Sequence, residues 1–285
     1  MYNIRWTNAA GDELRMGRKQ SLIRVISLTG IDGIPVKIVP SQGFDQIGES
    51  INNMSISSRS IGLIGRIYNF TGDELHRINY MFLPMSTVRL YFDDKYWIDC
   101  AVKETPVFTY DQCVVSFAVS LLAPYPYWLS VRENYYKLGG TSGGFNFPIS
   151  YNVPHNFGLY ADTLFLNCVN NGDTRVDYIA EITVTSGEAV NVTLTNAQNQ
   201  RYLKVYTSIS AQDTVRVFRE NNILRVTKTA AGITTDIFSA LDVDSTLYDM
   251  EVGDNVIRAT KDSGDGLLAV AIRFYDTLTA VHYGI

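Results

Sequence analysis

The sequence predicts a mainly β protein, with a β-sandwich-like N-terminal domain that contains one short helix and a C-terminal antiparallel β-sandwich. Apolar and polar residues alternate with a period of two over many short runs, and turn residues separate these runs. Aromatic residues make up 12% of the chain, which favours strands over helical bundles. A chain of 285 residues that is 46% hydrophobic can bury its core without disulfides.

The first half of the chain contains a series of short runs that predict strands. Gly62 and Gly65 interrupt one of these runs, and glycine inside a strand indicates a bulge or a close approach of another group. The last run ends at a proline-aromatic segment, where two prolines cannot donate to a sheet ladder. The predicted runs carry Tyr2, Ile4 and Trp6, then Ile23–Ile26, Val36–Val39, Ile61–Ile67, Val88–Phe92, Tyr96–Val102 and Cys113–Leu121.

One helix is predicted after Thr71. The segment Thr71-Gly72-Asp73-Glu74 has the form of a capping box, in which the threonine and glutamate side chains each satisfy a free backbone amide. Leu75, Ile78 and Phe82 then fall on one face, and Pro84 ends the helix.

We divide the chain into a domain of residues 1–130 and a C-terminal β-sandwich domain of residues 131–285. Residues 131–160 are rich in glycine and are either a linker or an irregular first hairpin. Turns then recur about every 8 to 12 residues, as in an antiparallel sandwich. Predicted strands are Ile182–Thr185, Val190–Leu194, Leu203–Tyr206, Val215–Phe218, Leu224–Thr227, Val256–Ala259 and Leu267–Tyr275, the last a central strand.

Charge and hydropathy exclude several classes of protein. The net charge is -5, and the longest basic cluster is the short segment 15–19, so we expect no sequence-specific nucleic-acid binding. An acidic protein can still surround DNA, because like charge keeps a passing strand from sticking. No apolar stretch is long enough for a membrane span, and we expect no signal peptide at the N-terminus.

The cysteines and histidines predict no metal site and no disulfide framework. Cys100, Cys113 and Cys168 are an odd number at wide spacing, and Cys100 and Cys113 lie in apolar runs, where cysteine acts as a small hydrophobe. This usage favours folding in a reducing cytoplasm. The histidines are too far apart for metal-ligand spacing; they are His76, His155 and His282.

The motifs that resemble catalytic or ion-binding sites fail in their context. Residues 140–144 match the G-x-S-x-G elbow around Ser142, but the required strand before it and helix after it are absent from the pattern. Residues 242–246 begin like a calcium loop and lack its glycine and further acid. We therefore predict no enzyme, no catalytic residue, no metal and no cofactor.

The order of elements resembles the distal tail protein family of siphophages, over nearly the whole chain. The segments that carry this resemblance are Ser60–Ile67, Tyr80–Pro84, Tyr96–Val102, Ala123–Trp128, Asn171–Thr174, Ala180–Val184, Val192–Asn196 and Met250–Ile257.

The resemblance implies a structural protein of the virion tail tip, assembled in the host cytoplasm. In that family the N-terminal domains form a hexameric ring, and a galectin-like C-terminal sandwich projects outward. The implied partners are further copies of the chain, the tail tube protein, the tail-associated hub protein and, at the periphery, a receptor-binding protein. DNA would pass through the lumen on ejection.

Five residues are candidates for contacts between subunits or with partners. Ring interfaces require exposed strand edges and hairpins. The turn at Asp93 and Asp94 and the aromatic residues Tyr125, Tyr127 and Trp128 fit this description. Packing of these side chains within the subunit is an equally compatible interpretation.

Two other functions compete with the ring protein. A galectin-like sandwich could be a carbohydrate-binding module for host glycans, although residues 161–285 contain no tryptophan and no cluster of the expected type. The chain could also be another tail component, such as a tube or baseplate protein. An enzyme ranks third.

Overall fold

The computed structural model describes residues 3–17, 23–68, 70–111, 113–138, 165–220 and 223–281. The chain forms two compact units, residues 1–132 with 277–285 (unit 1) and residues 133–276 (unit 2). The segment after residue 276 thus belongs to unit 1. The sequence-based division at residue 130 does not include this return, because one strand, Leu268–Leu278, crosses residue 276 without a break.

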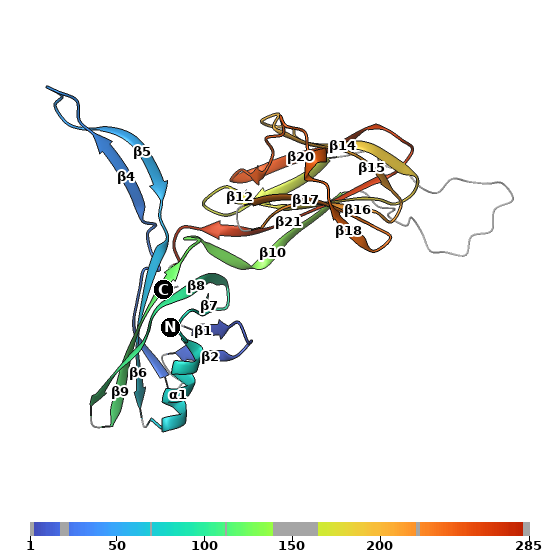
Figure 1. Ribbon diagram of the computed structural model, residues 1–285. Coiled ribbons are helices and arrows are strands. Elements are labelled where there is room, and N and C mark those ends of the chain that lie inside the picture. The colour runs from blue at the N-terminus through green and yellow to red at the C-terminus, as the bar shows by residue number, and fades with distance from the viewer. Residues whose placement is uncertain are drawn as a thin grey trace. The chain divides into compact units, whose positions relative to one another are not determined.

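Unit 1 consists of two antiparallel layers and a helix (Figure 1). One layer has the order β2-β1-β7-β8-β10 and the other β3-β6-β9-β8. Strand β8 belongs to both, since its first part pairs with β7 and its second part with β9. The elements are β1 Asn3–Asn8, β2 Glu13–Gly17, β3 Ile23–Thr29, β4 Val36–Ser41, β5 Ser50–Ile56, β6 Arg59–Tyr68, α1 Gly72–Met81, β7 Thr87–Phe92, β8 Tyr96–Asp111, β9 Val114–Ala123 and β10 Trp128–Leu138.

The core of unit 1 lies between the layers and under the helix. The rings of Trp6 and Phe82 meet edge to face, with centroids 5.3 Å apart. At Gly65 an added Cβ would lie 2.3 Å from the ring of Phe117. This confirms the close approach predicted for the glycines of this strand, because only glycine leaves room for the ring.

Helix α1 begins as the capping box predicts. The Glu74 carboxylate accepts the Thr71 amide at 2.9 Å, and the Thr71 hydroxyl accepts the Glu74 amide at 3.4 Å. Ile78 and Phe82 are buried, which confirms the predicted apolar face. In the described parts of the chain no helix is long and apolar enough to span a membrane.

Unit 2 is a β-sandwich, so the mainly β fold class is confirmed. One sheet has the order β11-β20-β14-β15, and β18-β17-β16-β13-β21 form the other. Every strand predicted here from the sequence lies in or overlaps an observed strand, and β21 lies between β13 and β10, as predicted for a central strand. The elements are β11 Phe165–Asn170, β12 Val176–Asp177, β13 Ile179–Val184, β14 Glu188–Asn196, β15 Tyr202–Ser210, β16 Thr214–Glu220, β17 Ile223–Ala230, β18 Ile233–Asp236, the 3-10 helix η1 Phe238–Ala240, β19 Asp249–Met250, β20 Gly253–Ser263 and β21 Leu268–Leu278.

One cysteine prediction is wrong. Cys100 is buried, as expected of a small hydrophobe, whereas Cys113 is exposed. Cys113 precedes β9 in the tight connection from β8, where its side chain is not held against the core. The alternating pattern of the following strand does not extend back to this residue.

Candidate assembly surface

The strands β4 and β5 form a ribbon that extends away from the rest of unit 1 (Figure 1). We call this ribbon and its connecting turn, residues 36–56, the arm. All residues of both strands are exposed. An isolated two-stranded ribbon is at best marginally stable in water, so the arm lacks the packing that normally supports a hairpin.

One face of the arm is apolar. Its cross-strand pairs are Val36 with Ile56, Ile38 with Met54, and Pro40 with Ile51. Met54 is 62% exposed, and Ile51 and Ile56 are each more than half exposed. Cross-strand apolar pairs of this kind normally face a core. Burying such side chains would contribute about 1.5–3 kcal/mol each, which makes this face a strong candidate for contact with another chain.

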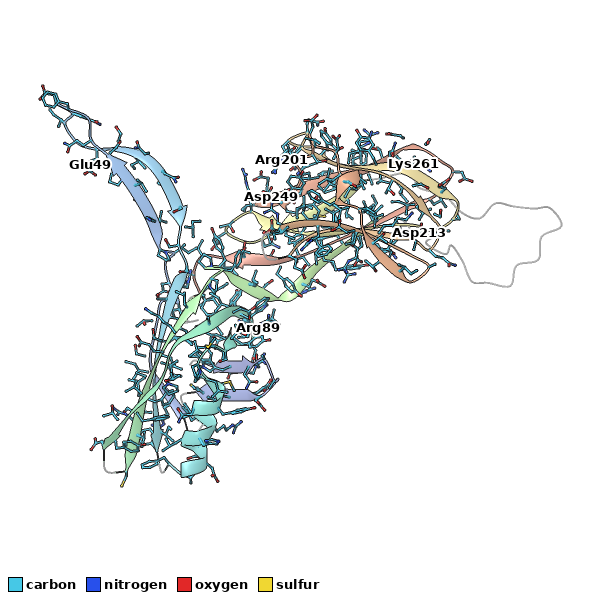
Figure 2. The ribbon with its side chains drawn as sticks, viewed as in Figure 1. Glu49, Arg89, Arg201, Asp213, Asp249 and Lys261 are labelled. Atoms are coloured by element: carbon cyan, nitrogen blue, oxygen red, sulfur yellow. The ribbon has the colours of Figure 1, made fainter. Side chains whose placement is uncertain are left out.

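The opposite face of the arm and its tip differ in character. Lys37 pairs with Ser55, and Val39 pairs with Asn53, so the opposite face is largely polar. At the tip, the side chains of Phe44 and Ile47 are fully exposed. Glu49 lies at this outer end of the arm (Figure 2).

The root of the arm is fixed by a buried arginine. Arg59 is 1% exposed, and its Nη1 donates to the carbonyl oxygens of Gly30 at 3.2 Å and Ile31 at 2.8 Å. Its Nη2 donates to the carbonyl oxygen of Thr279. Burial lowers the pKa of the Arg59 guanidinium, and the charge of Asp32 acts in the opposite direction. These carbonyls replace part of the water that the guanidinium loses on burial, so the arginine ties the two ends of the arm to the segment around Thr279.

Trp128 also belongs to this root, and its prediction as a contact residue needs correction. Its side chain is 0% exposed, and Nε1 donates to the carbonyl oxygen of Ile31 at 3.2 Å. The amide of Val281 approaches the same oxygen at 3.4 Å. The interpretation that this side chain packs within the subunit therefore holds for Trp128. The reason is that strand β10 starts with an inward-facing residue.

The other four predicted contact residues lie at the surface or in a turn. Asp93 and Asp94 occupy the β7–β8 turn with φ values of 51° and 50°. Their carboxylates accept bonds from the Asn3 amide at 2.9 Å and from Arg5 Nε at 2.8 Å. Both therefore stabilise the turn within the subunit, and their role in contacts stays a prediction.

The rings of Tyr125 and Tyr127 contact each other at an interplanar angle of 57° in the connection between β9 and β10. Their ring centroids are 5.3 Å apart, and Tyr125 is 42% exposed. The structure thus keeps this pair partly open to solvent while it buries the neighbouring Trp128. A role of the two tyrosines in subunit contacts also stays a prediction.

Sequence reasoning missed Arg59 and the apolar face of the arm. The signal for Arg59 is its spacing, because it falls on the inward face of β6 together with Ile61 and Leu63. The signal for the arm is the alternation in residues 50–56, which the sequence analysis did not assign to a strand.

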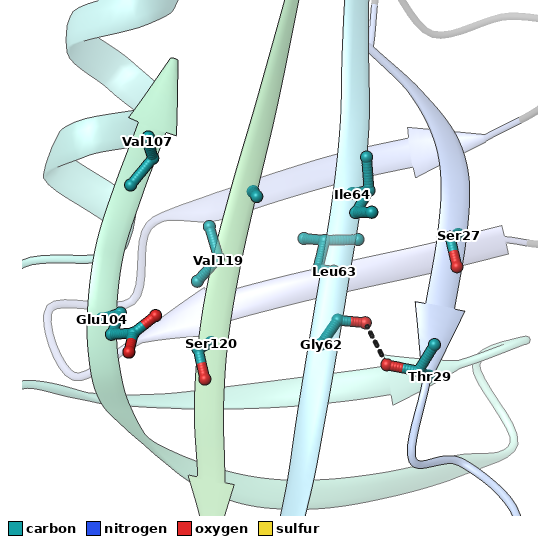
Figure 3. Close-up of a pocket in the computed structure, with 10 residues that line it drawn as sticks. Ser27, Thr29, Gly62, Leu63, Ile64, Glu104, Val107, Val119 and Ser120 are labelled. Carbon is teal, nitrogen blue, oxygen red and sulfur yellow. Dashed lines mark hydrogen bonds between the residues drawn. The ribbon is translucent and has the colours of Figure 1, made fainter. Parts of the chain in front are cut away.

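A shallow groove lies on the outer face of the β3-β6-β9-β8 layer (Figure 3). Its volume is about 200 Å³. Small residues form its floor, and Ile64 and Val107 rise from it with exposed side chains. Thr29 closes one side through a 3.4 Å bond from its hydroxyl to the carbonyl oxygen of Gly62. We call this feature the outer groove. Its lining also includes Ser27, Glu104, Ala118 and Ser120.

The described residues contain no group that resembles a catalytic or metal centre. Among them no three His, Cys, Asp or Glu side chains lie close enough to hold a metal ion. Burial raises the pKa of Cys100 and of Cys168 to about 12, so neither thiol is an available nucleophile. The Ser142 motif, His155 and His282 lie outside the described residues.

The outer face of β15 in unit 2 carries two tyrosines, Tyr202 and Tyr206, and an aromatic ring is the kind of side chain that could stack on a sugar. The hydroxyls of Tyr202 and Tyr206 both donate to the carboxylate of Asp242 at 3.3 Å. Lys204 pairs with Asp262 at 2.9 Å. These polar groups already satisfy one another, so the face does not favour a glycan site.

No protein-family model and no curated protein matches the sequence. The fold, in contrast, matches solved structures over nearly the whole chain. The crystal structure of the Dit (gp 19.1) protein of phage SPP1, described as a paradigm of the hub adsorption apparatus in phages that infect Gram-positive bacteria, aligns with a TM-score of 0.68 and 12% identity over 96% of this chain and 98% of that chain.

Chains of the phage P2 baseplate in its activated conformation are also similar. The calcium form aligns with a TM-score of 0.53 and 13% identity, and the strontium form with 0.50 and 11%; each match covers 99% of this chain and 100% of the other. The matches show that this chain has the fold of these proteins, which agrees with the resemblance to distal tail proteins seen in the sequence.

Proposed function

We propose that this chain is a structural subunit of an oligomeric ring at the tip of a phage tail, where it joins the tail tube to the hub and the host-adsorption apparatus. The single observation that carries the proposal is the apolar face of the arm, which the described part of the chain leaves uncovered. The fold shared with the SPP1 hub protein and with the P2 baseplate chains supports the same role.

A head-to-tail arrangement follows from the position of the arm. A protruding element that docks on a different surface of the next copy creates a heterologous contact, and such contacts close into a ring when the rotation permits. We propose a hexamer, with the tail tube protein on one axial face, the tail-associated hub protein on the other and a receptor-binding protein at the periphery. The location is the virion tail tip, and the role is structural and not enzymatic.

The test is the solution mass of the purified protein by light scattering, combined with negative-stain imaging. The expected result is a hexamer seen as a single ring with a central hole. Extending tubes would indicate a tube protein instead. A monomer at all accessible concentrations, also in the presence of the tail tube and hub proteins, would overturn the proposal.

A further inference from the structure

We infer that the outer groove is the docking site for the apolar face of the arm of a second copy of this chain. The inference rests on the proposed ring and names the contact that builds it. Both surfaces belong to unit 1, and each lacks a cover in the described part of the chain.

The two surfaces match in polarity. The arm offers a stripe of paired apolar side chains, among them Ile38 and Met54. The groove offers the exposed side chains of Ile64 and Val107 beside a floor of small residues. Large side chains on a ribbon can enter the space that glycine, alanine and serine leave on a sheet, as in the packing of two sheets face to face.

The charges beyond the groove indicate the direction of the arm. Arg24 and Arg66 lie directly opposite each other on β3 and β6, where like charges destabilise a sheet. Among the described residues neither arginine forms an ion pair; Arg24 stacks on Tyr68, 4.6 Å from the ring centroid, and Arg66 Nε donates to Ser116 at 3.4 Å. A carboxylate from outside the subunit would relieve this repulsion.

The arm carries such a carboxylate at its outer end (Figure 2). Glu49 lies in the turn of the arm, two residues before Ile51, the first apolar residue of β5. If Glu49 meets Arg66, then Ile51 lies over Ile64. The next apolar residue on β5 is Met54, three positions after Ile51. Because of the bulge, Ile51 and Met54 pair with Pro40 and Ile38, which are only two positions apart on β4. Met54 then lies over Gly62.

This register uses equal spacings on both surfaces. Two residues of a strand span about 7 Å. This distance separates Gly62 from Ile64 and Ile64 from Arg66. The arm repeats the same step from Met54 to Ile51, and Glu49 follows in the turn. The arm strand β5 of one copy therefore runs antiparallel to β6 of the next copy, with its acidic tip at the arginine pair.

Charge reversal tests the direction. Glu49→Arg should weaken subunit association at least about tenfold at low salt, because like charges then face each other. Arg66→Glu should have a similar effect, and the double variant should recover association. The matched control is Lys37→Glu on the polar face of the arm, which should leave the ring unchanged. A Glu49→Arg protein that associates like the parent overturns the contact with Arg66.

Cross-linking tests the register. In a Cys113→Ser background, Ile51→Cys with Ile64→Cys should give a ladder of covalent multimers with a short bifunctional maleimide, since the other two cysteines are buried. The control pair is Asn53→Cys with Ile64→Cys, in which the first thiol lies on the polar face and should give no ladder. Circular dichroism and thermal melting check that each variant folds; all these positions lie on the outer face of their strands.

The outcomes separate the inference from the proposed function. If the protein forms rings but the Ile51→Cys, Ile64→Cys pair gives no ladder, or if the control pair gives an equal ladder, the arm–groove contact is overturned. The proposed ring then stands, and another protein covers the arm. A parent protein that forms no ring overturns both.

Discussion

The arm and the β14–β15 hairpin of unit 2 are both antiparallel ribbons in which apolar and polar side chains alternate. In β14–β15 the apolar pairs Val192 with Val205 and Leu194 with Leu203 are completely buried under the second sheet. In the arm the equivalent pairs, such as Ile38 with Met54, are exposed. Alternation of apolar and polar residues therefore specifies a face that needs a cover, and the cover need not come from the same chain.

The largest expected effect is the loss of folding in unit 2 on Leu194→Lys. A charge placed between the two sheets has no partner, so we expect a destabilisation of more than about 4 kcal/mol. Denaturant unfolding followed by circular dichroism measures it. Thr193→Lys, on the outer face of the same strand, should stay close to the parent protein; equal effects of the two variants would contradict the assignment of the buried face.

The next effect in size concerns the root of the arm. Trp128→Ala should cost about 3–5 kcal/mol, because it removes a fully buried ring and its bond to Ile31. Tyr125→Ala, in the same proline-aromatic segment, should change the melting temperature little, since its ring is partly exposed. If Trp128→Ala loses little stability and Tyr125→Ala loses much, Trp128 is not the side chain that this segment contributes to the core.

Met54→Lys is the counterpart of the unit 2 variant in the arm. We expect the subunit to keep its stability within about 0.5 kcal/mol, because the side chain contacts no core, but we expect the ring to be lost. Light scattering and melting curves separate the two effects. Asn53→Lys, one residue away on the polar face, should still assemble. If Met54→Lys assembles as well as Asn53→Lys, the arm is not the interface.

Helix α1 lies between these extremes, since one face packs on the core and its start faces solvent. Thr71→Ala removes one of the two capping bonds and should cost about 1 kcal/mol. Thr71→Ser keeps a hydroxyl and should lose much less. Chemical denaturation of the two variants side by side gives the difference, and equal losses would mean that the cap hydroxyl contributes nothing.

The smallest perturbation is a thiol label, which reports burial without changing a core residue. At pH 8 a thiol reagent should modify Cys113 alone in the folded protein and all three cysteines after unfolding. The reason is that burial raises the pKa of Cys100 and Cys168 to about 12, so almost no thiolate is present. Mass spectrometry counts the labels. Rapid native labelling of Cys168 would show that unit 2 opens easily.

The sequence predicted those features in which local pattern and final environment agree. The capping box at Thr71 and the alternating strands of unit 2 follow from neighbouring residues alone. Trp128 and Arg59 could not be placed in the same way, because their environment is created by residues 31 and 279, far along the chain. The strand β5 was missed because a bulge between Ile51 and Asn53 breaks its alternation, although its partner around Val36–Val39 was predicted.

The bond between Arg59 and Thr279 also bears on when the arm becomes ready. The two residues are 220 positions apart, so during synthesis the arm leaves the ribosome long before the segment that fastens its root. Closing so long a loop is slow compared with forming the ribbon itself. A nascent chain therefore exposes the apolar face of the arm before the root of the arm is fixed. The root of the arm thus reaches its final state only after the segment around Thr279 has been made.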